Sequence, residues 1–365
     1  MAFCSLICTF AAEMKLHVFN PEHDIALASN LANFTAPHAG RQLRADLGFL
    51  PALWAEEDDV VLVDHVESAE KAFRKVSHRL RQTGCRILPA LNPQFTSTKQ
   101  GVYRQETSSL QPWGWDKAIR RELERNGFSA SLLPTVEQMD HIRQLSHRRT
   151  SANLLPALQM EGTVGEAFEC ATFEQVEQLL QRYGRLVLKA PWSSSGRGVR
   201  FLRTKEELGN FQSWILNIFK TQGSMMAEPY YNKVKDFGME FCADDTGIHY
   251  LGLSLFHTVN GAYVGNILAT ERVKQEIISR YISVSLLDSI KQEISKQLNL
   301  DGYVGPFGID MMVTKEGLHP CVEINLRRTM GHVALAISPS DDDIRGVMRV
   351  IYDGNHYKLK INKLR

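Results

Sequence analysis

The sequence lacks most of the signals that would assign it directly to a class of protein. Its 42 Lys and Arg residues almost balance its 41 Asp and Glu residues, so no basic excess indicates a nucleic-acid partner. No apolar run reaches the roughly 18 residues that a membrane span needs. No GxGxxG follows the first expected strand, and no Ser/His/Asp or Cys/His set has a recognisable spacing. Dinucleotide binding and a covalent protein nucleophile are therefore without support.

The composition is that of an ordinary soluble globular protein, with 44% hydrophobic and 23% charged residues in a chain of 365. That length is enough for two or three domains and a sizeable core. The cysteines form no CxxC pair, so we expect reduced, mostly buried thiols in a cytoplasmic protein and no zinc site. They are Cys4, Cys8, Cys85, Cys170, Cys242 and Cys321.

The first 13 residues are apolar, have no basic start and precede a second methionine, Met14, which opens a good strand. We interpret them as a disordered extension or as the product of an upstream start codon. A cleaved signal peptide, suggested by the Ala-rich end, is the alternative.

Residues 14–132 alternate strands and helices, which predicts a small open α/β domain. Polar, turn-rich residues 92–114 are expected to form a long loop or lid. The expected strands are 15–20, 58–65 and 85–90, and the expected helices, each ending at a glycine, are 68–84 and 115–127.

From residue 133 the pattern changes to helices followed by a run of strands. We expect one unit over 133–226 and another over 227–365. The expected helices are two within 133–162, then 173–184, 205–219 and 283–300, and the expected strands are 225–231, 236–244, 249–259 and 262–269.

One chemical signal is the segment VLKAPWSSSGRGV, residues 187–199. An apolar strand ends in Lys189 and is followed by small residues, which let backbone N–H groups turn toward an anion. A lone strand-end lysine could merely reach solvent, but the adjoining loop favours phosphate binding. The loop residues are Ser193, Ser194, Ser195, Gly196 and Gly198.

A second signal lies more than a hundred residues later, on the two alternating strands GIDMMV and CVEINL. A hairpin would bring Asp310, Glu323 and Asn325 together, and the spacing of two puts Glu323 and Asn325 on one strand face. Oxygen donors of this kind are the ligands that Mg²⁺ requires. A phosphate loop and a magnesium site in one chain predict nucleoside triphosphate chemistry.

This pairing resembles the ATP-grasp superfamily, and the 13 residues from Asp310 to Glu323 are similar to the spacing in D-alanine–D-alanine ligases. The resemblance covers about residues 133–340. It implies an α+β ATP-grasp fold, in which two subdomains clamp ATP with Mg²⁺, preceded by the open α/β domain.

The resemblance also implies further nucleotide contacts. Arg149 stands where many members have a lysine that touches the inner phosphates, although its geometry differs from that of a lysine. The run AEPYYNKVKD resembles the hinge strand that holds adenine. There Glu228 would accept from the adenine amino group, backbone groups of Pro229 and Tyr230 would follow the base edge, and Asp236 would bind the ribose.

Arg327 matches an arginine found two residues after the metal asparagine in several branches, including the biotin carboxylases. A guanidinium there binds the carboxylate substrate and stabilises its acyl-phosphate; Arg328 is the competing neighbour. Two departures are notable. Gly308 replaces an arginine of the D-alanine ligases, and Gly331 replaces the glutamate base of biotin carboxylases, which argues against bicarbonate chemistry.

Several polar residues have two readings of similar weight. Asn20, His23 and Asp24 follow the first strand and would line the acceptor pocket, or Asp24 caps a helix and His23 lies at the surface. His332 closely follows the metal strand, whereas His257 reads as structural.

The resulting expectation is an ATP-dependent ligase that joins a carboxylate to an amine through an acyl-phosphate and releases ADP and phosphate. Lys189 and Arg327 would act in catalysis, by position and charge. A kinase of the same fold and a nucleotide-binding regulator without turnover are the alternatives. The expected partners are small-molecule carboxylate and amine substrates and no nucleic acid or membrane, with a homodimer as the ordinary prior.

Overall fold

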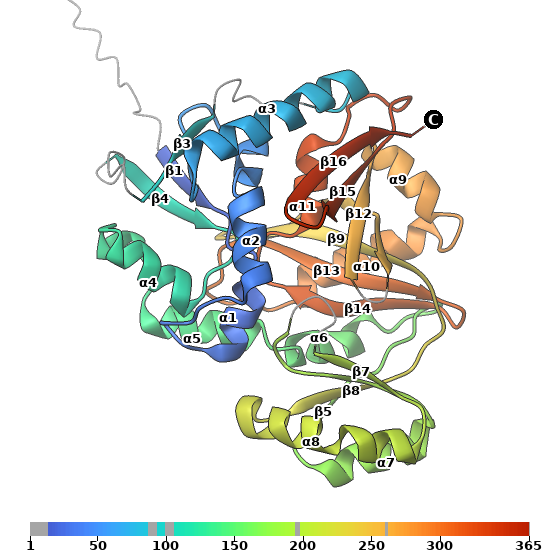
Figure 1. The fold of residues 1–365 in the computed structure, drawn as a ribbon. Coiled ribbons are helices and arrows are strands. Elements are labelled where there is room, and N and C mark those ends of the chain that lie inside the picture. The colour runs from blue at the N-terminus through green and yellow to red at the C-terminus, as the bar shows by residue number, and fades with distance from the viewer. Residues whose placement is uncertain (1–13, 87–92, 99–105, 194–197, 260–261, 365) are drawn as a thin grey trace, which may run out of the picture.

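The computed structural model describes residues 14–86, 93–98, 106–193, 198–259 and 262–364. Within these residues the strands form four sheets of four strands each. Figure 1 places the first sheet at one end of the molecule, a lobe with two helices at the bottom, and two further sheets between and beside them.

The first sheet is parallel and has the order β3-β2-β1-β4. Its strand β2 lies in the run VVLV, which is buried on both faces, as expected for a parallel strand covered by helices. Helices α3 and α4 cover opposite faces. The elements are β1 (Met14–Val18), α1 (His23–Ser29), α2 (His38–Leu47), η1 (Leu50–Leu53), β2 (Val60–Leu62), α3 (Val66–Thr83), β3 (Gln94–Thr96), β4 (Thr107–Pro112), α4 (Lys117–Arg125) and η2 (Ala130–Leu132).

The second sheet, β5-β8-β6-β7, forms the lower lobe together with α7 and α8. Thr172 begins α7 with a capping box, and Gly184 and Gly223 end α7 and α8. The elements are β5 (Phe168–Cys170), α7 (Phe173–Tyr183), β6 (Leu186–Lys189), β7 (Val199–Leu202), α8 (Lys205–Gln222) and β8 (Met225–Pro229).

The third sheet, β10-β9-β13-β14, is antiparallel and has two chemically different faces. Alternate residues Phe237, Met239 and Phe241 belong to a core that also contains residues of α5, α6 and α10. The period of two therefore sends Asp236 and Glu240 to the opposite face, which we call the open face. The elements are α5 (Val136–Leu145), α6 (Arg149–Leu154), η3 (Leu155–Leu158), β9 (Lys233–Asp244), β10 (Gly247–Ser254), α10 (Val284–Gln297), β13 (Gly305–Thr314) and β14 (Leu318–Asn325).

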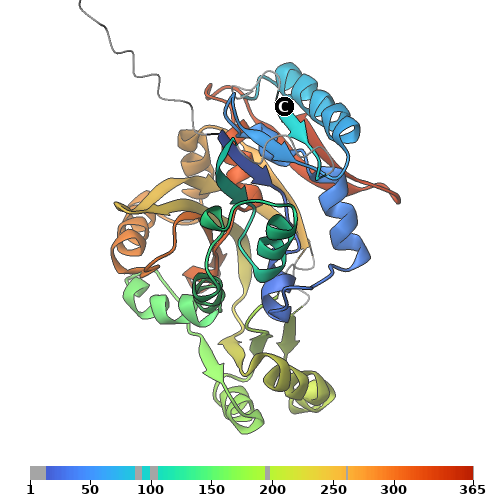
Figure 2. The same ribbon diagram turned by 90° about the vertical axis from the view of Figure 1, so that its left-hand side faces the viewer.

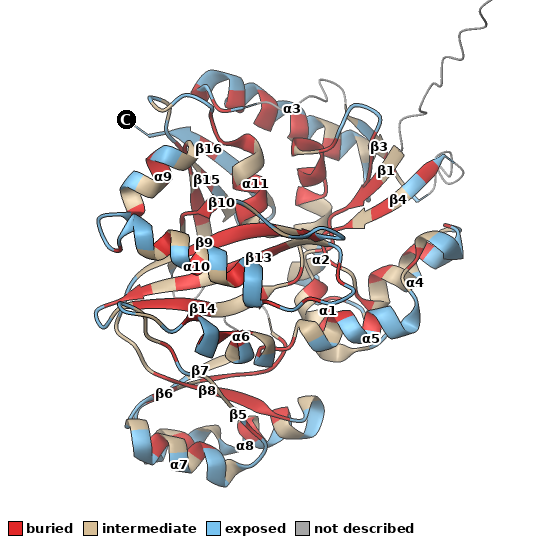
Figure 3. Cartoon of the chain, turned by 180° about the vertical axis from the view of Figure 1, so that it is seen from behind, coloured by how far each residue is buried: buried red, intermediate tan, exposed pale blue. Residues whose placement is uncertain are grey.

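The fourth sheet, β11-β12-β15-β16, joins the C-terminal end of the chain to the first sheet. One apolar cluster contains Leu268, Met348 and Ile361 from this sheet together with Phe73 and Val61. Figure 3 shows the buried strands inside and the exposed faces of the helices outside. The elements are β11 (Phe256–Val259), β12 (Ala262–Leu268), α9 (Glu271–Ile278), α11 (Met330–Ile337), β15 (Gly346–Tyr352) and β16 (Tyr357–Lys363).

Two sequence expectations for the first sheet need comment. The long loop expected over 92–114 is wrong for the described part of that range, because β3 and β4 lie there and pair with β2 and β1. The strand expected at 85–90 falls mostly outside the described residues. The loop prediction failed because short strands at sheet edges carry polar side chains such as those of TSSLQP.

Candidate nucleotide and metal site

The predicted metal ligands meet on the open face of the third sheet. Asp310 lies directly opposite Glu323, and Gly308 lies opposite Asn325. Asn325 donates from Nδ2 to Asp310 Oδ2 at 3.2 Å, while its Oδ1 accepts from Arg327. No group of three or more His, Cys, Asp or Glu side chains suited to a metal occurs in the described part of the chain, so the cluster is two carboxylates and one amide.

Asp310 is electrostatically strained. Burial, the neighbouring Glu323 carboxylate and the carboxylate of Glu240 raise its pKa to about 7, although Arg327 opposes them. A positive charge between Asp310 and Glu323 would relieve this repulsion, which fits the residues to a divalent cation.

Lys189 ends β6 with its side chain 7% exposed, and its Nζ donates to Glu228 Oε2 at 2.6 Å. The same Nζ lies 3.5 Å from the carbonyl oxygen of Val322, on the metal strand β14. The strand-end lysine therefore points into the space between the second and third sheets rather than to solvent.

The described ends of the small-residue loop are held close together. Ala190 donates its N–H to the Gly198 carbonyl at 2.8 Å. A Cβ on Gly198 would lie 2.4 Å from Ser193 Oγ, so only glycine fits there. Ser194, Ser195 and Gly196 fall outside the described residues.

The two adjacent arginines at the start of α6 point to different partners. Arg149 donates to Glu169 at 2.5 Å and has a side chain 45% exposed. Arg148 is buried and bridges the two predicted halves of the site. Its Nη1 lies 2.7 Å from Glu323 Oε2, and its Nη2 donates to Ser193 Oγ at 3.2 Å. Sequence reasoning missed Arg148.

The residues predicted to hold the base and ribose lie on β8 and β9. Pro229 is buried at the end of β8, and the Tyr230 N–H donates to the Arg185 carbonyl. Asp236 lies opposite Met312 on the open face, and its Oδ2 accepts from Lys233 at 2.7 Å and from Thr258 at 2.5 Å.

Arg327, not Arg328, faces the predicted site. Its Nε and Nη2 both donate to the Asp24 carboxylate at 2.8 Å. Although burial alone would raise the pKa of Asp24, the guanidinium holds it below its ordinary value. The Arg328 guanidinium instead lies 4.8 Å from the centre of the Trp54 ring, and burial lowers its pKa to about 10.

The other two residues after β1 each line a pocket and are also hydrogen-bonded within the fold. Asn20 donates to the carbonyl of Gly114 at 2.8 Å, and His23 lies 3.1 Å from Asp116, the residue that caps α4. His23 is 1% exposed, so its reading as a surface histidine is wrong. Only Asp24 of the three turns toward Arg327.

Glu240 is a site residue that the sequence reasoning passed over. It is 3% exposed and lies on the open face, opposite Gly308, which is two residues before Asp310 on β13. It accepts from Thr329 at 2.8 Å, and His332 lies 2.9 Å away. A Cβ on Gly308 or Gly331 would lie 2.5 Å or 1.8 Å from its carboxylate oxygens. The two glycine departures thus leave room for this carboxylate, and the alternation in DFGMEFCAD was the signal for it.

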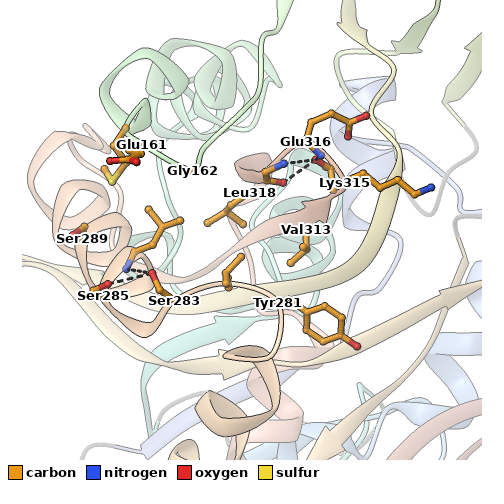
Figure 4. Close-up of a pocket in the computed structure, with 15 residues that line it drawn as sticks. Glu161, Gly162, Tyr281, Ser283, Ser285, Ser289, Val313, Lys315, Glu316 and Leu318 are labelled. Atoms are coloured by element: carbon orange, nitrogen blue, oxygen red, sulfur yellow. Dashed lines mark hydrogen bonds between the residues drawn. The ribbon is translucent and has the colours of Figure 1, made fainter.

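One of two pockets considered for a ligand is lined by these residues, and the other is not. A narrow one of about 20 Å³ lies between α1, the phosphate loop and β14, and its lining includes Asp24, Ser193 and Glu323. A larger one of about 730 Å³ lies at the turn of the β13–β14 hairpin, beside α10 (Figure 4), and no predicted site residue lines it.

Sequence comparison adds nothing to the assignment: no protein-family model and no curated protein matches the chain. No helix of the described segments has the length and apolar character needed to cross a bilayer.

Solved structures, in contrast, match over most of the chain. One is N5-carboxyaminoimidazole synthetase from Staphylococcus aureus complexed with ADP, with a TM-score of 0.50 and 13% sequence identity, covering 94% of this chain and 83% of that chain. Another is a biotin carboxylase–beta-gamma-ATP complex from Campylobacter jejuni, with a TM-score of 0.50 and 13% identity, covering 93% of this chain and 75% of that chain. At this identity the likeness establishes the fold alone, and it is the fold that the two motifs predicted.

Proposed function

We propose that this chain, which has the ATP-grasp fold, is a Mg²⁺- and ATP-dependent ligase that joins a carboxylate to an amine through an acyl-phosphate. Two of the matching structures are complexes, one with ADP and one with beta-gamma-ATP, which supports a nucleotide as ligand here.

One observation carries the proposal: Arg148 touches both halves of the predicted site. Its guanidinium lies 2.7 Å from Glu323 on the metal strand and donates to Ser193 on the phosphate loop at 3.2 Å. The two motifs, separated by more than a hundred residues, are therefore within one side chain of each other. A triphosphate between them would meet Arg148 and Lys189 on one side and a cation held by Asp310 and Glu323 on the other.

At the phosphate end of the site, each residue would have a separate role. A bound Mg²⁺ would offset the charge that develops on the transferred phosphoryl group. Lys189 and Arg148 would grip the phosphate oxygens, and Ser193 and Gly198 would present the loop backbone. Arg149 would keep a weaker, outer contact with the phosphates, because it is paired with Glu169.

At the base end, Glu228, Pro229 and Tyr230 would follow the edge of the adenine, and Asp236 would bind the ribose hydroxyls. Asn325 would complete the metal site after its amide oxygen turns from Arg327 to the cation. At the acceptor end, Arg327 would bind the carboxylate substrate beside Asp24, its partner at 2.8 Å. The amine then attacks the acyl-phosphate carbon, and phosphate leaves.

The test is phosphate release from ATP and Mg²⁺ across pooled carboxylic acids and amines. We expect release that depends on both substrates and that falls by more than a hundredfold, about 3 kcal/mol or more, in Lys189→Ala. Lys296→Ala, at a lysine that is 71% exposed, is the matched control and should keep the wild-type rate.

Arg148→Ala should lose more activity than Arg149→Ala, because only Arg148 bridges the two motifs. ADP formed without phosphate, in the presence of an alcohol, would select a kinase instead. Tight binding of Mg-ATP with no turnover across the whole panel would select a regulatory protein.

A further inference from the structure

Among the described residues, no other residue forms a hydrogen bond with either ring nitrogen of His319, although the side chain is 1% exposed. A buried polar atom without a partner costs the folded state about 1–3 kcal/mol, so native proteins rarely keep one without a reason. Here two such atoms belong to one side chain. The imidazole therefore has an unused donor and an unused acceptor inside the protein.

The position of His319 gives that reason. It lies directly opposite Met312, and Met312 lies opposite Asp236, so the three side chains form one row across β14, β13 and β9. Beyond an irregularity in the register of β13 and β14, the row of Glu323, Asp310 and Gly238 lies on the same face. His319 thus shares the open face with the proposed metal and ribose residues.

The other neighbours of His319 include residues of the proposed base-binding hinge and Gly165. The Tyr231 ring meets it edge-on, with centroids 5.7 Å apart. A Cβ on Gly165 would lie 3.0 Å from its Nε2, so the chain backbone passes close to the ring. The pair Lys189 and Glu228 is near enough to act on its charge.

The ring is neutral at pH 7. Burial and the positive charge of Lys189 lower the pKa of His319 to about 4, although Glu228 opposes them. A neutral imidazole offers one N–H donor and one acceptor. Adenine offers three ring nitrogens as acceptors and one amino group as donor, and the amino group falls to Glu228 in the proposed function.

We propose that His319 donates a hydrogen bond to a ring nitrogen of the bound purine base and is a residue of nucleotide recognition. The inference rests on the proposed function for its ligand and adds to it a specific base contact. Binding of the base would then give His319 the hydrogen bond that it lacks in the nucleotide-free protein, which stabilises the complex. Without the nucleotide, the unpaired ring nitrogens lower the stability of the protein.

His319→Phe separates this role from a structural one, because affinity and stability move in opposite directions. The dissociation constant for ATP, measured by calorimetry with Mg²⁺, should rise about tenfold, which corresponds to one lost hydrogen bond. The Tm of the nucleotide-free protein should equal or exceed that of the wild type, since two unpaired polar atoms are removed. His319→Asn, which keeps a donor, should recover part of the affinity.

Base analogues test the same contact on the unaltered protein. Among 1-deaza-, 3-deaza- and 7-deaza-ATP, one should bind the wild type about tenfold more weakly than ATP and bind His319→Phe no more weakly than ATP does. His257→Phe, at an exposed histidine of β11, should leave every affinity unchanged.

The outcomes separate the two proposals. A wild type that does not bind ATP removes the proposed function and this inference with it. A wild type that binds ATP, with His319→Phe equal to it in affinity or weakened together with a lower Tm, overturns the inference alone. Equal wild-type affinity for all three analogues and ATP also overturns it.

Discussion

Each cation that we assign to phosphate or carboxylate binding is paired with a carboxylate in the structure. Lys189 is paired with Glu228, Arg148 with Glu323 and Arg327 with Asp24. Unpaired buried charges are costly, so these pairs keep the site assembled before substrates arrive. Asp310 is an exception among the carboxylates of the site, because the neighbouring carboxylates of Glu323 and Glu240 repel its charge.

This exception gives a pH prediction. The pKa of Asp310 is raised to about 7 in the folded protein from an ordinary 3.8, so the folded state binds the proton more tightly and loses stability as pH rises between these values. The unfolding free energy of Asp310→Asn, relative to that of the wild type, should increase by about 1–3 kcal/mol as the pH rises from 4 to 8. Urea denaturation across that range measures it, and a difference that is independent of pH would contradict the account. Ligase activity should be lost in the same variant.

Asp24 should behave in the opposite way. Its pKa is lowered from 3.8 by Arg327, so the stability it contributes is present above pH 4 and lost as pH falls below it. Asp24→Asn should lower the unfolding free energy at pH 7 by about 1–3 kcal/mol, since it leaves Arg327 without its counterion. Asp140→Asn, which breaks an exposed pair with Lys117, is the control and should cost less than about 1 kcal/mol. Equal losses in the two variants at pH 7 would contradict the prediction.

The choice between neighbouring arginines was the hardest step of the sequence reasoning at this scale. Arg148 and Arg149 are adjacent at the start of a helix, and a helix turns by about 100° per residue, so they point to different sides. The resemblance placed Arg149 where the family has its lysine, and nothing in HRRTSANLL fixes where the helix begins, so Arg148 was not considered. Arg327 and Arg328 posed the same problem on an extended segment.

At the scale of elements, strand alternation organises the site. On β9 the residues Asp236, Gly238 and Glu240 face the site, while the apolar residues between them face the core. The hairpin of β13 and β14 was predictable from its pattern, and so was the meeting of Asp310 with Glu323. The contact between Glu240 and the start of α11 was not, because it joins segments that are about 90 residues apart.

The packing of Glu240 against α11 predicts the effect of Gly331→Ala. A Cβ there would lie 1.8 Å from Glu240 Oε1, and Glu240 is held by Thr329 and His332, so we expect a loss of about 1–3 kcal/mol. Gly209→Ala, in open space on α8, is the matched control and should be neutral or stabilising.

A double-mutant cycle locates the cause of that loss. Much of the cost of Gly331→Ala should disappear when Glu240→Ala is present, because the clashing carboxylate is gone. Full additivity of the two changes would show that Glu240 is not the obstacle.

For the whole molecule, the site depends on contacts between parts of the chain far apart in sequence. Asp24 and Arg327 are separated by 303 residues, and one apolar cluster joins α3 and η1 to β12, α11, β15 and β16. The order of strands and helices was readable from the sequence because each element has its own period. The joining of the first and fourth sheets was not, because an apolar face does not specify which other face covers it.

A crystal structure with Mg²⁺ and a non-hydrolysable ATP analogue tests the account most directly. We expect the triphosphate between Ser193 and Gly198 on one side and Asp310 and Glu323 on the other, with the metal bound to both carboxylates and the base beside Glu228 and His319. A nucleotide bound elsewhere, for instance in the pocket of about 730 Å³ at the β13–β14 turn, would contradict the central claim.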